Sequence, residues 1–590
     1  MPIQEWIHHW EEGKGARGLK VAAAILGFVA LACLFDALAY QGFSSEEAME
    51  TAQLARNLSR GRGYTTETIR PLSILLLREQ APPGQAAQVL RKPVPDLSTP
   101  PVYPVLLAGL MAVLPFDFVA NQNQYWYFAP ERWIGVFNQI LFFLAVFLLF
   151  RVALRLFDSR VAWLSAVLFA GSNLFWKFTV SGLSTTWLVL VFLAAVWCLV
   201  RIQEKGMEGG GGIGVATLAL AAGAGVWIGV GALSRYAFAW MIIPVLLFIG
   251  WVTPRSRFRH GAVAATAFLV VFGPWVARNL HLSGTLFGTA SYAILDQTPP
   301  FQQDTLERSF DLEAGFRQVG PLDVVDKFLL NAREVWRDDL PRLGGNWVSA
   351  FFLVGLLVPF RQPALGRMRV FVLCSLAILM VAQAAGQTHL TGDSPEINSE
   401  NLLALLAPLV ILYGVVLFYT LLDQLSLVTL ETRGALVGGF VLVMCAPLLI
   451  SLLVVHRTDR NTPYSPLGIQ RVARMMRSEE LMVSDIPAAV AWYGDRLCGW
   501  LPLDDDQEFY EFNRLKPIKA VYLTQRTTNA RFLSQMMLEP KSWGHFVMDA
   551  CQTYGEVPPG FPLTKAPKGL LPDRMLVTDE PRWRLPIATP

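Results

Sequence analysis

The chain is dominated by long apolar runs that short polar loops separate. A helix needs roughly 17–25 apolar residues to cross the hydrocarbon core of a bilayer. Such runs occur near residues 19–40, 132–150, 161–178, 183–200, 213–233, 236–252, 260–277, 345–360, 370–386, 402–422 and 435–455. The pattern predicts a polytopic α-helical membrane protein with about eleven transmembrane helices.

Segment 101–116 is also apolar, but it is short and bracketed by prolines. Its length fits a re-entrant or interfacial segment better than a span. Lys and Arg near helix ends concentrate on the cytoplasmic side of a membrane. With the N-terminus inside and 101–116 left out of the count, the basic loops all fall inside: Lys14–Lys20, Arg151–Arg160, Arg201–Lys205, Arg255–Arg259, Arg361–Arg369 and Arg433. Counting 101–116 as a span would place every later cluster outside, so we expect eleven spans.

This topology predicts where the polar sequence lies. Two large loops, about 41–131 and 278–344, are expected outside the cytoplasm, as is the tail. Residues 1–455 would form a transmembrane domain and residues 456–590 a small extracytoplasmic α/β domain, because short strand-like runs alternate with amphipathic stretches in the tail. The strands are expected at Leu481–Ser484, Leu497–Leu501 and Ala520–Thr524, and the helices near 467–478, 505–513 and 528–538.

Composition agrees with a membrane protein. Of the 590 residues, 53% are hydrophobic and only 16% are charged, whereas soluble domains carry about 25% charged residues. The net charge of +3 argues against a nucleic-acid partner and leaves membrane lipids as the expected surroundings. A transporter is a less favoured class, because transporters usually place charged or broken-helix sites at the midplane, often in repeated halves. These spans are nearly free of charge, and no internal repeat is found.

Three carboxylates follow the first span directly. On a helix, Glu46 and Glu50 share a face and Glu47 lies beside them. A partly desolvated carboxylate at a membrane boundary is suited to act as a general base toward a hydroxyl or an amine. The alternative is an ordinary solvated helix face, capped by Ser44 or Ser45.

Two arginines and one polar loop complete the candidate chemistry of the outer face. Arg235 and Arg278 lie at outward helix ends, where Arg is uncommon. A guanidinium there binds a lipid phosphate or reaches the headgroups. The loop before the tenth span is either a site for a metal or a sugar or an ordinary hydrated loop, and the spacing of its polar residues matches no standard metal site. These residues are His389, Asp393, Glu396, Asn398, Glu400 and Asn401.

Several segments, in order along most of the chain, resemble the polyprenol-phosphate-sugar-dependent glycosyltransferases of the GT-C superfamily, family 39. This group includes protein O-mannosyltransferases and aminoarabinose transferases. The matching segments are Glu46-Glu47, Ala55-Arg56-Asn57-Leu58, Gly61-Arg62-Gly63-Tyr64, Pro100-Pro101-Val102-Tyr103-Pro104, Ser234-Arg235-Tyr236, Pro274-Trp275-Val276-Ala277-Arg278-Asn279 and Ala491-Trp492-Tyr493-Gly494-Asp495-Arg496.

The resemblance implies a GT-C-like fold and an inverting transfer of a sugar from a polyprenyl-phosphate donor to a lipid, glycan or protein acceptor. Glu46 or Glu47 would deprotonate the acceptor. The donor phosphate would be bound by Arg278, Arg235 and Tyr236. The acceptor side or groove would contain Arg56, Tyr103, Asn279, Glu396 and Asn401. The resemblance identifies no certain cofactor, and assistance by a divalent metal stays open.

The chain departs from the family pattern in two places. The acidic pair usually begins with Asp; here matching the pair points to Glu46, whereas counting back from Arg56 points to Glu47. Thr185 stands where the family often carries a carboxylate. An inactive scaffold of an envelope glycan assembly is therefore the alternative to an enzyme. The likeness of the tail to bacterial members predicts a multi-pass protein of the bacterial inner membrane.

Overall fold

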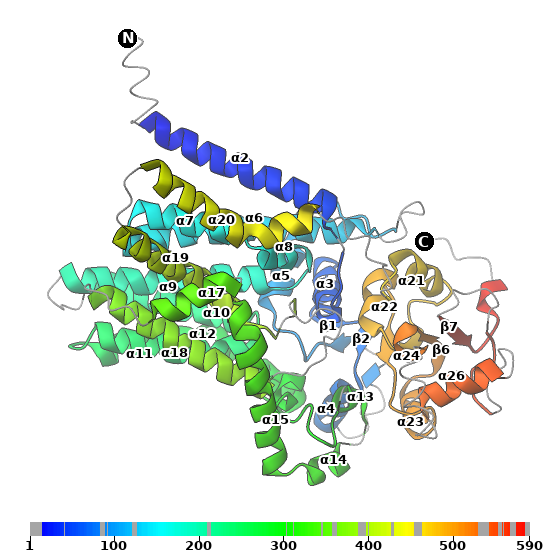
Figure 1. Ribbon diagram of the computed structural model, residues 1–590. Coiled ribbons are helices and arrows are strands. Elements are labelled where there is room, and N and C mark those ends of the chain that lie inside the picture. Colours follow the sequence, from blue (N-terminus) through cyan, green and yellow to red (C-terminus); the bar gives the residue numbers. More distant parts are fainter. Residues whose placement is uncertain are drawn as a thin grey trace.

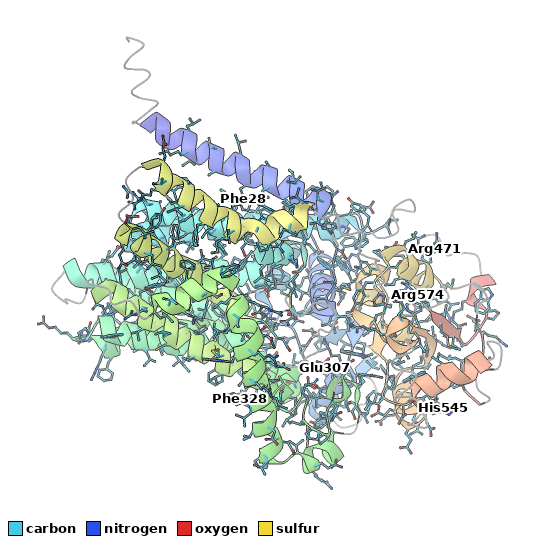
Figure 2. All side chains as sticks on the ribbon, in the orientation of Figure 1. Phe28, Glu307, Phe328, Arg471, His545 and Arg574 are labelled. Atoms are coloured by element: carbon cyan, nitrogen blue, oxygen red, sulfur yellow. The ribbon has the colours of Figure 1, made fainter. Side chains whose placement is uncertain are left out.

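Long helices and a small sheet occupy opposite ends of the molecule in the computed structural model (Figure 1). Figure 2 shows Glu307 at the junction of the two parts. The structure describes residues 14–40, 42–82, 89–90, 93–120, 127–208, 214–302, 304–310, 312–343, 346–356, 363–386, 397–398, 400–425, 430–453, 463–528, 542–552, 557, 560–566 and 574–584.

Among these residues, eight helices are long and apolar enough to cross a membrane. They are α2 (Lys14–Leu38), α6 (Ala129–Leu156), α9 (Thr185–Glu208), α10 (Val215–Ala232), α12 (Arg257–Ser283), α18 (Pro363–Gly386), η5 (Leu402–Leu406) continued by α19 (Ala407–Gln424), and α20 (Leu430–Leu453). A ninth candidate is the pair α7 (Ser159–Ala170) and α8 (Asn173–Val180), which is bent by 51°. The predicted polytopic α-helical fold class is confirmed.

The other predicted spans are helical but shorter. Residues 236–252 form η2 (Tyr236–Met241) and α11 (Ile242–Val252), and the run near 345–360 contains α17 (Asn346–Gly355). By length and composition, the described helices therefore support eight or nine spans where eleven were expected. Segment 101–116 forms α5 (Val102–Val113), which is too short to count as a span, as its length predicted.

The sheet at the other end has five strands in the order β2-β5-β4-β6-β7. Strands β4 (Leu481–Ser484), β5 (Cys498–Trp500) and β6 (Ile518–Leu523) are parallel and coincide with the predicted runs. β7 (Met575–Thr578) pairs antiparallel with β6. The tail also forms α21 (Pro466–Ala473), α22 (Pro487–Gly494), α23 (Gln507–Leu515), α24 (Gln525–Thr528), α26 (Trp543–Gln552) and η6 (Arg582–Arg584). The helix predicted near 528–538 lies almost entirely outside the described residues.

The sheet is completed by the first large loop. β2 (Thr68–Ile69) pairs in parallel with β5, so residues more than 400 positions apart in sequence share one ladder. The same loop forms α3 (Glu46–Ser59), α4 (Pro71–Gln80) and an antiparallel pair of β1 (Thr65–Thr66) with β3 (Val94–Pro95). The second large loop forms η3 (Gly288–Tyr292), α13 (Thr305–Arg308), α14 (Glu313–Gln318), α15 (Pro321–Glu334), η4 (Val335–Asp339) and α16 (Leu340–Arg342).

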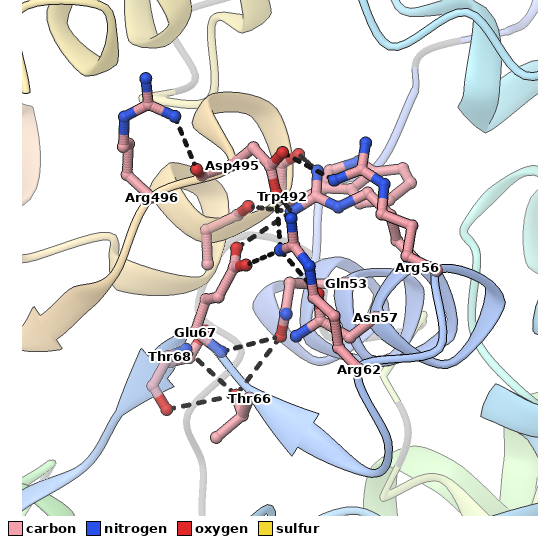
Figure 3. A network of polar contacts seen from close by, with 12 residues as sticks. Gln53, Arg56, Asn57, Arg62, Thr66, Glu67, Thr68, Trp492, Asp495 and Arg496 are labelled. Atoms are coloured by element: carbon pink, nitrogen blue, oxygen red, sulfur yellow. Dashed lines mark hydrogen bonds and ion pairs between the residues drawn. The ribbon is translucent and has the colours of Figure 1, made fainter. Parts of the chain in front are cut away.

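The helix α3 joins the bundle to the sheet. Its small and unbranched residues Ala48, Met49, Ala52 and Ala55 are fully buried, which lets α3 pack closely on α5 and α22. At the far end of α3, Arg56 is 1% exposed and lies in a polar network that Figure 3 shows from close by. This packing fixes the direction in which the first turn of α3 points, and that turn carries Glu46 and Glu47.

Candidate active site

A cavity of about 340 Å³ lies where the first turn of α3, the second large loop, α18 and the sheet domain meet. Its lining is strongly acidic, so we call it the acidic cavity. The carboxylates that line it are Glu46, Glu47, Glu50, Asp296, Asp304, Glu307 and Glu400, and the cations are Arg70 and Arg526. A second cavity of about 220 Å³, the side cavity, is lined by Arg235 and Tyr236 and shares part of its wall with the first.

Glu46 faces the sheet domain. Its carboxylate forms an ion pair with Arg526 of α24 and accepts a hydrogen bond from the Tyr464 hydroxyl at 3.4 Å. Arg526 also donates to that hydroxyl at 2.8 Å. Burial raises the pKa of Glu46, and the positive charge of Arg526 opposes the rise. Two residues of the tail therefore control the orientation and charge of this carboxylate.

Glu47 is the more accessible member of the pair, with 45% of its side chain exposed. Its Oε1 lies 3.3 Å from Nη2 of Arg235, and Glu47 lines both cavities. Ser45 is the N-cap residue of α3, but its side chain makes no capping hydrogen bond. Both glutamates lie in the first turn of α3, where the helix dipole stabilises negative charge.

Glu50, one turn further along α3, is bound differently. Both of its oxygens accept from Nη2 of Arg70, at 2.6 and 2.7 Å, and Arg70 also pairs with Glu307 at 3.1 Å and donates to Ser98 at 2.7 Å. Burial raises the pKa of Glu50 while Arg70 opposes the rise. Because this carboxylate is enclosed by its partner, it serves to hold Arg70 in the cavity wall.

The predicted phosphate ligands separate into two groups. Arg235 and Tyr236 line the side cavity. Arg278 lines neither cavity; it lies over the rings of Trp275 and Tyr64, 4.4 and 5.5 Å from their centroids, and donates to Asn279 Oδ1 at 3.0 Å.

Asn279 links these groups. It is buried and donates to the Tyr236 hydroxyl at 3.0 Å, and Trp275 donates to the same hydroxyl at 2.9 Å. Arg278 and Asn279 thus lie behind Tyr236 and fix its position in the wall of the side cavity.

Two residues expected in the groove lie elsewhere. Arg56 donates to the carbonyls of Ala491 and Trp492, both at 2.7 Å, and pairs with Glu67 and Asp495, so it ties α3 to α22 (Figure 3). Tyr103 is buried against the bundle and donates to Asn138 Oδ1 at 2.9 Å. Neither lines either of the two cavities, and the same is true of Asn279 and Asn401, the other described residues expected in the groove.

The remaining candidates belong to the loop before η5. Asn401 caps η5 by accepting from the Ala404 amide at 3.3 Å, and its neighbour Glu400 lines both cavities. Glu396, His389 and Asp393 lie outside the described residues. Thr185 begins α9, is buried, and its hydroxyl has no hydrogen-bond partner within the part of the chain that the structure describes.

Sequence reasoning missed the contributions of Arg526, Tyr464, Arg70 and Asp296, because none of them lies in a motif that points to the first turn of α3. It also missed Glu131 of α6, which accepts hydrogen bonds from the Phe43 amide, Trp492 and Tyr493 at 3.1, 3.2 and 2.6 Å. An isolated Glu directly before the span predicted at 132–150 was the available signal, since carboxylates at the edge of a span are costly unless they are paired.

No group of three or more His, Cys, Asp or Glu side chains suited to a metal ion is found among the described residues. The cations that contact the cavity carboxylates there are arginines.

Comparisons with known proteins place this geometry in context. A family model described as dolichyl-phosphate-mannose-protein mannosyltransferase matches residues 99–277. A comparison with curated proteins found no match. Among solved structures, ArnT from Cupriavidus metallidurans bound to undecaprenyl phosphate is similar with a TM-score of 0.54 at 12% identity, over 95% of this chain and 99% of that chain.

Two structures of the oligosaccharyltransferase from Archaeoglobus fulgidus are similar as well. AglB in complex with an inhibitory peptide and a dolichol-phosphate has a TM-score of 0.52 at 11% identity, over 95% of this chain and 74% of that chain. The form tethered with an acceptor peptide has a TM-score of 0.53 at 12% identity, over 88% and 70%. The resemblance to the GT-C glycosyltransferases is thus confirmed: this chain has their fold, and its residues 99–277 match the dolichyl-phosphate-mannose-protein mannosyltransferase family.

Proposed function

We propose that this protein is a membrane glycosyltransferase that moves a sugar from a polyprenyl-phosphate donor to a lipid, glycan or protein acceptor, with inversion at the sugar carbon. The observation that carries the proposal is the position of Glu47. It lines both the acidic cavity and the side cavity and contacts Arg235 across their junction. Their contact at 3.3 Å puts a carboxylate that can act as a general base beside a guanidinium that can bind phosphate, where the two cavities meet.

In this mechanism Glu47 removes the proton from the acceptor hydroxyl or amine. The freed electron pair attacks the anomeric carbon, and the bond from that carbon to the phosphate oxygen breaks. The polyprenyl phosphate leaves with an additional negative charge. Because Glu47 becomes neutral when it takes the proton, Arg235 loses its present counter-ion and is available to stabilise the leaving phosphate.

Other residues act by positioning these two. Asn279 and Arg278 hold Tyr236 in the wall beside Arg235. Arg526 and Tyr464 hold Glu46, and Glu50 holds Arg70. We place the acceptor in the acidic cavity, where the sheet domain contributes to the wall, and the donor phosphate in the side cavity.

The reaction is placed on the non-cytoplasmic side of a bacterial inner membrane. The arrangement of the helix ends supports the non-cytoplasmic side. Trp187, in the first turn of α9, donates to Ser234 of the side cavity at 2.9 Å. The opposite end of α9 carries Arg201, which pairs with Glu204 at 2.8 Å, and Arg155 of α6 reaches the same carboxylate. Basic loops, which favour the cytoplasm, are therefore at the far end from the cavities.

The proposal is tested with the full chain reconstituted in liposomes. Radiolabelled sugars linked to undecaprenyl phosphate or dolichyl phosphate are supplied with an extract of bacterial envelope acceptors, and transfer of label is followed. We expect transfer by the wild type and a rate roughly 100–10,000-fold lower for Glu47→Gln, the usual contribution of a general base. Equal rates for the two proteins, or no transfer by the wild type from any donor, would contradict the proposal.

One observation favours the scaffold alternative. Thr185 occupies the place where the family often carries a carboxylate, and its buried hydroxyl and that of Thr186 have no hydrogen-bond partner among the described residues. A protein that no longer catalyses transfer would tolerate two buried threonine hydroxyls at this place. Under this alternative the chain would still bind polyprenyl phosphate, while Thr185→Asp would leave transfer undetectable; recovered transfer in that variant would instead show a weakened enzyme.

A further inference from the structure

The helix α15 has its polar and apolar faces reversed relative to a helix on a water-exposed surface. Leu322 and Leu329 are 76% and 58% exposed, and Val325 is exposed on the same stripe. These positions follow a helical repeat of three to four residues, so they form one continuous face. The face continues at Trp336 of η4, which is also exposed.

The buried face of α15 is polar. Lys327 and Asn331, one turn apart, are only 5% and 2% exposed. Lys327 donates to the Ala293 carbonyl at 2.6 Å, and Asn331 donates to the Ala384 carbonyl of α18 at 3.0 Å. A helix that places lysine inward and leucine outward is stable only if the outer face contacts an apolar medium.

Two features identify that medium as lipid. In Figure 1, α15 runs crosswise to the long helices α9, α10 and α12, so it lies roughly in the plane of any membrane that those helices cross. The candidate span α18, which α15 contacts through Asn331, also exposes an apolar side chain at Val381, one turn before Ala384.

The residues beside the apolar stripe fit a headgroup boundary. Arg333 and Arg337 are exposed next to it, with Trp336 between them in sequence, and the carboxylates of Asp326, Glu334 and Asp338 are exposed on the same segment. Arginine reaches phosphate headgroups and tryptophan prefers the membrane interface.

We propose that α15 is an interfacial helix whose apolar face is embedded in the surface of the bilayer and whose buried polar face holds the walls of the acidic cavity in place. The connection is direct, since Ala293 lines that cavity and Ala384 precedes the lining residue Gly386 by two positions on α18. The membrane surface thereby sets the position of the acidic cavity, which a lipid-linked substrate would reach from the bilayer. This inference goes beyond sugar transfer and holds whether or not the protein transfers a sugar.

The lipid contact is tested by photo-crosslinking the full chain in liposomes of phosphatidylethanolamine and phosphatidylglycerol. p-Benzoylphenylalanine is placed at Leu329, at Leu269 on the span α12 as a positive control, and at Arg514 on α23 as a negative control; all three positions are exposed. We expect lipid adducts by mass spectrometry at Leu329 and Leu269 and none at Arg514. A covalent dimer at Leu329, or no lipid adduct there, would overturn the proposal.

The coupling to the cavity is tested by hydrogen exchange in the same liposomes. Leu322→Asp with Leu329→Asp places charge in the apolar face without touching Lys327. We expect amide exchange in Gly288–Tyr292, the η3 segment beside Ala293, to increase several-fold, with no change for Arg514→Asp. If the charged α15 leaves the lipid and amide exchange in η3 is unchanged, then α15 does not position the wall of the acidic cavity.

Discussion

Replacing Arg56 with alanine is the sharpest test of how the bundle and the sheet domain are held together. The guanidinium is 1% exposed and donates to two backbone carbonyls of α22, and it pairs with Glu67 at 3.2 Å and Asp495 at 2.9 Å. It also lies over the rings of Phe118 and Trp492, 5.6 and 5.5 Å from their centroids. All of these contacts are lost together in Arg56→Ala.

The loss of unfolding free energy in Arg56→Ala depends on which partners of Arg56 keep another cation or donor. Breaking a buried ion pair by removing one partner usually costs about 3–5 kcal/mol. Here Arg60 still contacts Asp495 at 2.7 Å and Arg62 still contacts Glu67 at 2.8 Å, so neither carboxylate is left without a cation. The main loss is then the two buried carbonyls without donors, about 1–3 kcal/mol each. We expect Arg56→Ala to destabilise the fold by about 3 kcal/mol.

The assay is thermal unfolding of the detergent-solubilised chain at one fixed scan rate, because membrane proteins of this size often unfold irreversibly. At an unfolding entropy of about 2 cal/mol/K per residue, a loss of about 3 kcal/mol lowers the midpoint of this 590-residue chain by roughly 2–3 °C. Arg60→Ala is the matched control; Arg60 is 34% exposed and its pair with Asp495 is worth about 1 kcal/mol or less. Equal midpoints for the two variants would refute the reasoning that Arg56 joins α3 to α22.

Three further outcomes are expected. Glu131→Ala should lower the unfolding midpoint more than Glu131→Gln, because alanine leaves three donors without an acceptor; equal midpoints would contradict this. Gly288→Ala should lower transfer activity and stability, because Gly288 has φ +60° and an added Cβ would lie 1.9 Å from the Leu97 carbonyl oxygen; a variant with wild-type melting would count against a tight wall there. Burial raises the pKa of Asp296 to about 8, so the stability it contributes is present at low pH and is lost as the pH rises through about 8. Melting of Asp296→Asn should therefore depend less on pH between 5 and 9 than melting of the wild type, and parallel curves would exclude this assignment.

The transmembrane helices and the three parallel strands were predictable because their signals are local. Long apolar runs and short apolar strands flanked by turns are visible in any window of the sequence. The run at 345–360 was harder to delimit, since its described helix α17 ends at Gly355. The strand β2 was not predictable, because two residues, Thr68 and Ile69, carry no periodicity and find their partner 430 positions away.

The candidate site was predictable only in its local part. Glu46 and Glu47 follow a span, and Arg235 and Tyr236 lie at a turn between apolar runs, so local sequence placed them near a membrane boundary. The pairing of Glu46 with Arg526 depends on how the tail folds over α3, which no local pattern encodes.

For Arg56, a sequence motif was present but led to the wrong position for the side chain. Its motif resembled one from a known family and suggested a groove residue, yet its side chain is enclosed between α3 and α22. A motif identifies a segment more securely than it identifies the role of one side chain.

The most direct test of the central claim compares the three carboxylates around the junction of the cavities. Single-turnover transfer of labelled sugar from an undecaprenyl-phosphate donor is measured for Glu47→Gln, Glu46→Gln and Glu400→Gln against the wild type. We predict that Glu47→Gln lowers the rate roughly 100–10,000-fold, and that the other two variants keep most of it. A wild-type rate in Glu47→Gln, with the loss appearing in Glu46→Gln or Glu400→Gln, would contradict the assignment of Glu47 as the base.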